Sequence, residues 1–176
     1  MKKLLCTAIA LALAFTAIAA LAEPATYTDR SKDFTLTYEA DDFEITTEEY
    51  QADDDDNLVL VLGGKNEAWG EVFIRFIRTE LDTDADLKAY QDAEAELIAG
   101  VGATRGEWNG FHDVLMYAIE DEECTEQSFV ISCSDDETMS ILVHVENIED
   151  EEAIMERDDQ ISAVLGSLTF IEDDDD

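Results

Sequence analysis

The sequence predicts an α+β fold, with one mainly antiparallel β-sheet and helices packed on it. Two observations support this prediction. Short apolar runs bounded by turn residues, which are typical of strands, follow one another along the chain. Two segments with apolar side chains at helical spacing interrupt these runs. The resulting order is strands, a helix, a meander of strands and a second helix.

The first half of the chain contains four candidate strands. Residues 34–38 (FTLTY) alternate between apolar and polar side chains, as in a half-buried strand. The continuous apolar run at 57–62 (NLVLVL) is suited to a strand that is covered on both faces. A weaker strand at 43–47 precedes it, and a partner strand at 71–79 follows a turn at residues 63–66.

The first helix is predicted over residues 82–103, where apolar side chains such as Leu87 and Leu97 recur at helical spacing. Asp82 or Asp84 is expected to cap its first turn, because a carboxylate accepts hydrogen bonds from the unpaired N–H groups there. Gly100 and Gly102 are expected to end the helix.

The second half begins with a predicted β-hairpin. Asn109-Gly110 lies between two strand-like runs, and both residue types tolerate the positive φ angles of a type I′ turn. Further strands are predicted in EQSFVISCS and TMSILVHVEN. The last helix is expected to begin near Asn147, with one apolar face that contains Ile154, Ile161, Val164, Leu165 and Leu168.

The N-terminus has the pattern of a Sec-type signal peptide. Lys2 and Lys3 precede an apolar run, and Ala20-Leu21-Ala22 matches the small-x-small pattern of a cleavage site. We therefore expect cleavage after Ala22 and a secreted, periplasmic or cell-envelope protein. The alternative is an uncleaved membrane anchor, because the apolar run is long enough to span a bilayer.

The mature chain is expected to form a single domain without stable membrane insertion. Residues 1–22 are assigned to the signal peptide, 23–33 to an N-terminal segment, 34–170 to the α+β domain and 171–176 to an acidic tail. No internal repeat or Ser/Pro-rich linker indicates a further boundary.

The mature chain is strongly acidic. Removal of Lys2 and Lys3 leaves eight basic side chains against 45 acidic ones, a formal charge of −37. Nucleic acid and anionic membrane surfaces are therefore excluded as partners, because both would be repelled. Basic proteins and dissolved cations remain compatible with this charge, and a simply solvated acidic surface explains most of it.

The aspartate runs are candidate cation sites with a plainer explanation. Neighbouring aspartates at 53–56 point to alternate sides of an extended chain, so few can converge on one ion, and a solvated loop is expected. The same holds for 173–176. Asp82-x-Asp84-x-Asp86 imitates an EF-hand loop, but Leu87 and Ala93 replace its glycine and bidentate glutamate. We therefore assign no metal ligand and expect at most weak divalent-cation binding.

The remaining reactive residues do not form a recognisable catalytic set. Cys124 and Cys133 are expected to lie too far apart along their strands to form a disulfide. A Cys133–His144 pair would need an exposed, activated thiol, whereas Cys133 shares a face with apolar residues. His112 has no zinc-ligand spacing. No catalytic residue or cofactor site is therefore assigned.

The aromatic residues Trp69, Trp108 and Tyr117 have two explanations. They could line a ligand site, but aromatic side chains in strands usually belong to the core.

The order of elements resembles the PsbP-like family. The resemblance lies in FTLTY near the mature start, the helix DLKAYQDAEAELIAG, the meander of strands and a terminal helix running QISAVLGSLTF, and it covers residues 34–170. It implies an α/β/α sandwich around an antiparallel sheet. Family members include a photosystem II extrinsic subunit, a nuclear import factor that binds Ran, and exported bacterial proteins, so the shared theme is non-enzymatic binding.

Three functions follow as hypotheses. The first is an exported, non-catalytic binding domain for a protein partner or small ligand, which an exposed apolar patch would favour. The second is an acidic extracytoplasmic protein with weak calcium binding, which a carboxylate cluster would favour. The third is an enzyme of unknown chemistry, which a pocket with perturbed carboxylates would favour.

Overall fold

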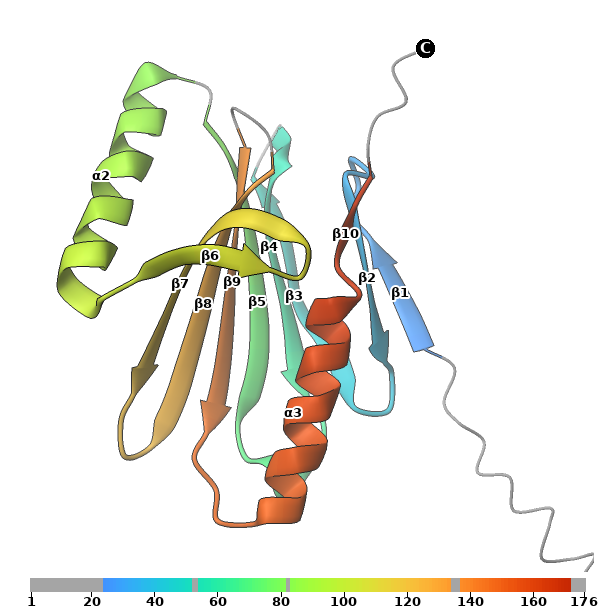
Figure 1. Ribbon diagram of the computed structural model, residues 1–176. Coiled ribbons are helices and arrows are strands. Elements are labelled where there is room, and N and C mark those ends of the chain that lie inside the picture. The colour runs from blue at the N-terminus through green and yellow to red at the C-terminus, as the bar shows by residue number, and fades with distance from the viewer. Residues whose placement is uncertain (1–23, 52–53, 82, 134–136, 172–176) are drawn as a thin grey trace, which may run out of the picture.

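The computed structural model describes residues 24–51, 54–81, 83–133 and 137–171. These residues form two antiparallel sheets and two helices, which confirms the α+β prediction (Figure 1). The large sheet has the order β3-β4-β5-β9-β8-β7-β6, and the small sheet has the order β1-β2-β10. The prediction of one sheet was therefore wrong.

The elements have the following bounds. The large sheet contains β3 (Phe43–Gln51), β4 (Asp54–Gly64), β5 (Val72–Glu80), β6 (Thr104–Trp108), β7 (Phe111–Glu120), β8 (Cys124–Ser132) and β9 (Glu137–Glu146). The small sheet contains β1 (Pro24–Thr28), β2 (Phe34–Glu39) and β10 (Thr169–Phe170). The helices are α2 (Asp84–Val101) and α3 (Glu151–Gly166), and η1 (Glu67–Trp69) is a 3-10 turn.

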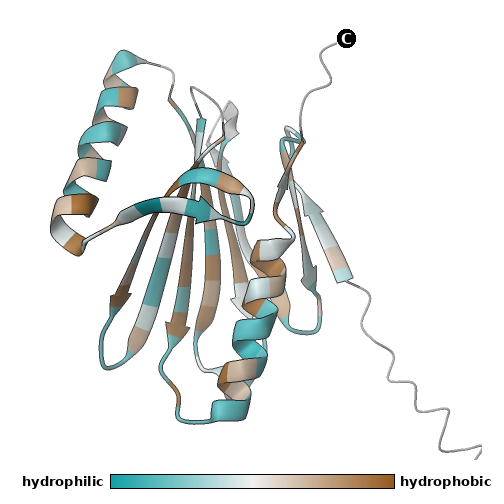
Figure 2. Ribbon diagram, viewed as in Figure 1, coloured by the Kyte–Doolittle hydropathy of each residue, from teal (hydrophilic) through white to brown (hydrophobic). Residues whose placement is uncertain are grey.

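The main core lies between the large sheet on one side and α3 with the small sheet on the other (Figure 1). Hydrophobic residues are frequent along the strands of the large sheet (Figure 2). Buried and partly buried residues alternate along β5, because successive side chains of a strand point to opposite faces. Val114 and Ile131 belong to the main core, whereas their neighbours Leu115 and Val130 pack under α2 on the opposite face. The two helices therefore cover opposite faces of the large sheet.

Helix α2 is capped by Thr83, rather than by either of the predicted aspartates. The Thr83 side chain accepts a hydrogen bond from the backbone N–H of Asp86 at 3.2 Å. Gly102 ends the helix in the left-handed conformation with φ of 74°, as predicted. Glu94 is buried on the inner face of α2, where it accepts hydrogen bonds from Arg105 and Tyr90.

Helix α3 begins at Glu151, after Asp150, whose carboxylate accepts the N–H groups of Glu152 and Ala153. The predicted start near Asn147 was therefore a few residues early. Ile154 was also misplaced, because it is only partly buried. The buried face of α3 contains Ala153, Arg157, Ile161, Val164 and Leu165.

The β6–β7 hairpin has the predicted turn. Asn109 has φ of 48° and Gly110 has φ of 84°, and the flanking residues Trp108 and Phe111 pair across the turn. The hairpin crosses in front of the large sheet and reaches the C-terminal end of α3 (Figure 1). There the Asn109 Nδ2 donates a hydrogen bond to the Leu165 carbonyl at 3.0 Å.

The small sheet is tied to the large one by a buried ionic cluster. Arg78 of β5 donates to Asp29 at 2.9 Å and also pairs with Asp33 and Glu137. Asp29 in turn accepts the backbone N–H of Phe34. Strand β1 lies within the segment 23–33, for which the sequence predicted no element.

The prediction that the strand at 57–62 is covered on both faces was wrong. Leu58, Leu60 and Leu62 are buried in the main core, whereas Val59 and Val61 on the other face remain partly exposed. No helix among the described residues is both long and apolar enough to cross a membrane. The signal peptide prediction lies outside the described residues.

Candidate binding cleft

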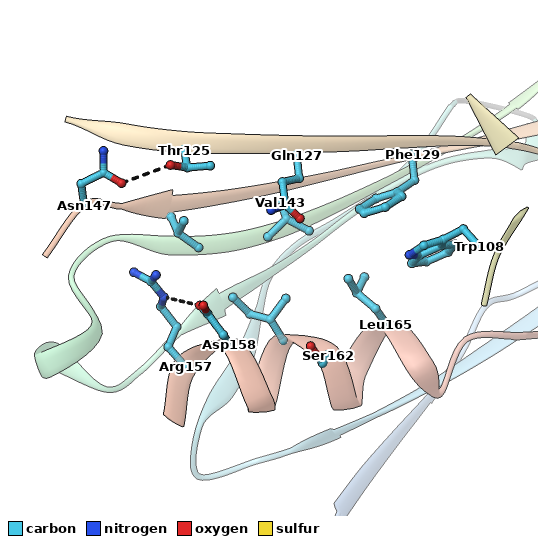
Figure 3. A pocket seen from close by; sticks show the side chains of 12 residues that line it. Trp108, Thr125, Gln127, Phe129, Val143, Asn147, Arg157, Asp158, Ser162 and Leu165 are labelled. Atoms are coloured by element: carbon cyan, nitrogen blue, oxygen red, sulfur yellow. Dashed lines mark hydrogen bonds and ion pairs between the residues drawn. The ribbon is translucent and has the colours of Figure 1, made fainter. Parts of the chain in front are cut away.

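A cleft of about 400 Å³ lies between α3 and the face of the large sheet that carries the main core. Strands β8 and β9 form its floor, α3 forms its wall, and Trp108 of the β6–β7 hairpin lies at one end (Figure 3). The cleft is lined by Trp108, Thr125, Gln127, Phe129, Val143, Val145, Asn147, Arg157, Asp158, Ile161, Ser162 and Leu165.

One end of the cleft is aromatic and apolar. The Trp108 and Phe129 rings stack with centroids 4.4 Å apart, and Leu165 faces them from α3 (Figure 3). The bond from Asn109 to the Leu165 carbonyl fastens the hairpin to the end of α3. The Asn109-Gly110 turn therefore holds Trp108 in place at this end of the cleft.

The other end is polar and contains Arg157, whose side chain is only 7% exposed. Its Nη1 donates to the Glu146 carbonyl at 2.9 Å and to the Trp69 carbonyl at 3.5 Å, and its Nε donates to Asp158 at 3.0 Å. These bonds fix the guanidinium in place. The Nη2 nitrogen has no hydrogen-bond partner in the described part of the chain, where every wholly buried side-chain nitrogen or oxygen has one. Nη2 is therefore not wholly buried.

Further polar groups lie along the floor and the wall. Thr125 donates a hydrogen bond to the Asn147 side chain at 3.2 Å, beside Arg157 (Figure 3). Gln127 lies in the middle of the floor, and its side-chain amide makes no hydrogen bond within the described ranges, so this amide can both donate and accept. Ser162 adds a hydroxyl from the exposed side of α3.

The lining supplies groups that bind, orient and stack against a ligand. It contains no histidine or cysteine, and its single carboxylate, Asp158, is paired with Arg157. Asp42 lies outside this lining; its pKa is raised first by burial and then by the nearby Glu156.

The aspartate runs are only partly described. Asp54, Asp55 and Asp56 lie in β4 rather than in the predicted loop, and Asp54 pairs with Gln51 of β3. Asp53 and residues 173–176 lie outside the described residues. Asp84 and Asp86 occupy the first turn of α2. Among the described residues, no group of three or more His, Cys, Asp or Glu side chains is placed to hold a metal ion.

Cys124 and Cys133 lie at opposite ends of β8, and both are free thiols. Burial raises the pKa of the Cys133 thiol to about 12. His144 pairs with Glu126 near the Cys124 end of the same strand. About seven residues of strand, roughly 23 Å, therefore separate His144 from Cys133, and the structure does not bring this pair together.

The three candidate aromatic residues have different environments. Trp69 is fully buried, and its indole N–H donates to Glu156 at 3.4 Å. Tyr117 packs beneath α2. Trp108 alone of the three lines the cleft. His112 is exposed on the hairpin, where its ring contacts Glu107.

Sequence reasoning missed most of the cleft. Arg157 did leave a signal, because it stands four residues from both Ala153 and Ile161 on the apolar face of α3. A charged residue at such a position indicates a specific buried role. Gln127 and Asn147 left no comparable signal, since their positions depend on the way α3 folds back over β8 and β9.

Comparisons with known proteins do not name a family. No family model matches the chain. No curated protein matches it significantly. A solved structure from Bacteroides thetaiotaomicron VPI-5482 aligns with 84% of this chain at 10% sequence identity and a TM-score of 0.49. The aligned region is 48% of that protein, so this chain spans about half of its length.

Proposed function

We propose that this protein is an exported, non-catalytic binding domain of the PsbP-like type, and that the cleft beneath α3 binds a small amphiphilic molecule. The observation that supports the proposal most strongly is the cleft itself. It places a stacked aromatic pair at one end and a fixed, partly accessible guanidinium at the other. Its volume of about 400 Å³ lies within the range of small-molecule sites.

The lining indicates the chemistry of the ligand. A flat apolar group would pack beside Trp108 and Phe129, since aromatic rings favour offset or edge contacts with other rings. An oxygen acceptor or anionic group would bind Nη2 of Arg157, because hydrogen bonds to a charged donor are the stronger kind. Gln127 would add a hydrogen bond midway.

Export and family type rest on the sequence pattern. The cleavage pattern at Ala20-Leu21-Ala22 supports secretion. The PsbP-like type is supported by the order of elements in the sequence, from FTLTY to the terminal helix QISAVLGSLTF.

The cleft is tested with 1-anilinonaphthalene-8-sulfonate, which combines fused aromatic rings with one anionic group. Its binding to residues 23–176 is measured by fluorescence in 0.15 M NaCl. Ser162→Trp places a large side chain at the cleft wall, on an exposed helix position, and is expected to weaken binding at least tenfold.

The matched control is Ala163→Trp. Ala163 is the next residue of α3, is also exposed and does not line the cleft, so binding is expected to stay within twofold. Equal affinities for the two variants would refute the cleft as the site. Circular dichroism of both variants confirms that the fold is retained.

A further inference from the structure

The face of the large sheet opposite the cleft has an apolar surface that we call the open face. It contains Val59, Val61, Phe73, Ile77 and Leu142, which the strand register places on the same side of β4, β5 and β9. Each of these side chains is only partly buried. These apolar residues lie around Arg75, which the register places between Val61 and Leu142. Apolar surface that is left open to solvent across neighbouring strands is typical of interaction sites in soluble proteins.

Helix α2 covers a different part of the same face. The cluster beneath it consists of Ala103, Leu115 and Val130, with Tyr90, Leu97 and Tyr117 packed around them. None of these residues belongs to β4, β5 or β9. In the described part of the chain, the open face therefore lies beside α2 and outside the cluster that the helix buries.

The open face contains a shallow hollow whose lining includes one cation, Arg75. The hollow measures about 410 Å³ and is lined by Thr47, Glu49, Val59, Val61, Phe73 and Arg75. The Arg75 guanidinium carbon lies 5.6 Å from the Phe73 ring centroid, and His144 stacks on Phe73 with centroids 4.6 Å apart. Arg75 has no ion pair or hydrogen bond within the described ranges.

The margins of the open face are acidic. Glu44 and Glu49 of β3 lie on one side, opposite Gly63 and Val59, and Glu126 of β8 lies on the other, opposite His144. Together with the mature charge of −37, these carboxylates repel a second copy of the chain and attract a cationic partner.

We propose that the open face docks a cationic amphipathic helix of a partner protein. The apolar side of that helix would pack on Val59, Val61 and Leu142, and its basic residues would reach the glutamates at the margins. The positive charge of Arg75 would repel a lysine or arginine of the bound helix at that point, and this repulsion would fix the position of the helix along the strands. This site is separate from the cleft and does not depend on the function proposed for it.

The dimensions favour a helix. Three strands about 4.8 Å apart span roughly 10 Å, which is about the diameter of one helix with its side chains. Helix α2 already packs on the adjacent strands of the same face. A second helix centred on β5 would lie three strands, or about 14 Å, from β7, on which α2 packs, so α2 leaves room for it.

The probe is an 18-residue amphipathic Leu/Lys peptide, and its affinity for residues 23–176 is measured by calorimetry. Val61→Asp makes the protein more negative, but it replaces an apolar contact of the open face with a carboxylate opposite Arg75. We expect it to weaken binding at least tenfold. The control Met155→Asp adds the same charge at an exposed position on α3 and is expected to change affinity less than twofold.

The direction in which the aspartate variants change the peptide affinity distinguishes specific docking from electrostatic adsorption. If binding is electrostatic adsorption, both aspartate variants bind equally well or more tightly, and the proposal is wrong. A peptide of the same composition without the amphipathic pattern is expected to bind at least tenfold more weakly than the probe. If circular dichroism shows that Val61→Asp does not fold, Leu142→Ala replaces it, with an expected loss of three- to tenfold.

Hydrogen exchange locates the peptide. Protection on binding is expected in β4 and β5 and not in α3. Protection over α3, or sedimentation that shows the chain dimerising through a face that Val61→Asp disrupts, would overturn the proposal. Ser162→Trp, which blocks the cleft, is expected to leave peptide affinity unchanged.

Discussion

The turn residue Asn109 makes two separable contributions to stability, and a pair of substitutions resolves them. Its backbone has φ of 48°, a conformation that costs most residues with a Cβ about 1 kcal/mol or more. Its side chain donates to the Leu165 carbonyl at 3.0 Å, and such a bond contributes about 1 kcal/mol. Asn109→Ala loses both contributions, so we expect a loss of about 2 kcal/mol.

Asn109→Gly keeps the positive φ accessible and loses only the hydrogen bond, so the expected loss is about 1 kcal/mol. For a domain of this size, each kcal/mol lowers the melting temperature by about 2–4 °C. Thermal and urea unfolding of both variants measure the difference. Equal losses would refute the backbone contribution, and no loss in either variant would refute the view that Asn109 fastens the hairpin to α3.

Three further predictions concern the rest of the molecule. Arg78→Met should lower the free energy of unfolding by about 3–5 kcal/mol, because it leaves the buried Asp29 and the partly buried Asp33 and Glu137 without their cation; a loss below about 1 kcal/mol in urea unfolding would contradict this. The raised pKa of Cys133, about 12, means that the native thiol keeps its proton at pH values where the unfolded thiol loses it, so stability should fall as the pH rises from about 9 towards 12. A urea midpoint that falls as steeply in Cys133→Ala as in the wild type would count against that assignment. At matched ionic strength, calcium, magnesium and sodium chlorides should raise the melting temperature equally, through screening of a self-repelling surface; a rise specific to low millimolar calcium would instead indicate a site.

The elements with local signals were predictable. The Asn109-Gly110 turn, the glycine cap of α2 and the alternation in FTLTY each depend on residues close together in the sequence. Strand β1 was missed because its pairing requires β2, and β10, which pairs on the other side of β2, is a strand of two residues from the far end of the chain. No pattern within residues 23–33 could predict that this segment pairs with β2.

Coverage of the sheet faces was not predictable from periodicity. In the run NLVLVL, every residue after Asn57 is apolar, so both faces of the strand are apolar, which indicates burial on both sides. The structure instead covers the leucine face and leaves Val59 and Val61 on the open face. The sequence pattern shows that both faces of this strand are apolar. Which face another element covers depends on tertiary packing, which the pattern does not contain.

The cleft was even less accessible to sequence reasoning. Its lining residues come from the β6–β7 hairpin, two central strands, the loop after β9, and α3. Arg157 was the one residue with a detectable anomaly, as a charge on an apolar helix face. The spacing between Trp108 and Arg157 in the sequence carries no information, because their proximity to one cavity arises only when α3 packs on the sheet.

The most direct test of the account is an NMR titration of ¹⁵N-labelled residues 23–176 with 1-anilinonaphthalene-8-sulfonate. We expect saturable shifts in the backbone amides of residues 125–129 and 157–165, with β4 and β5 unaffected. Shifts confined to the open face, or spread over the surface without saturation, would contradict the assignment of the cleft beneath α3 as the ligand site.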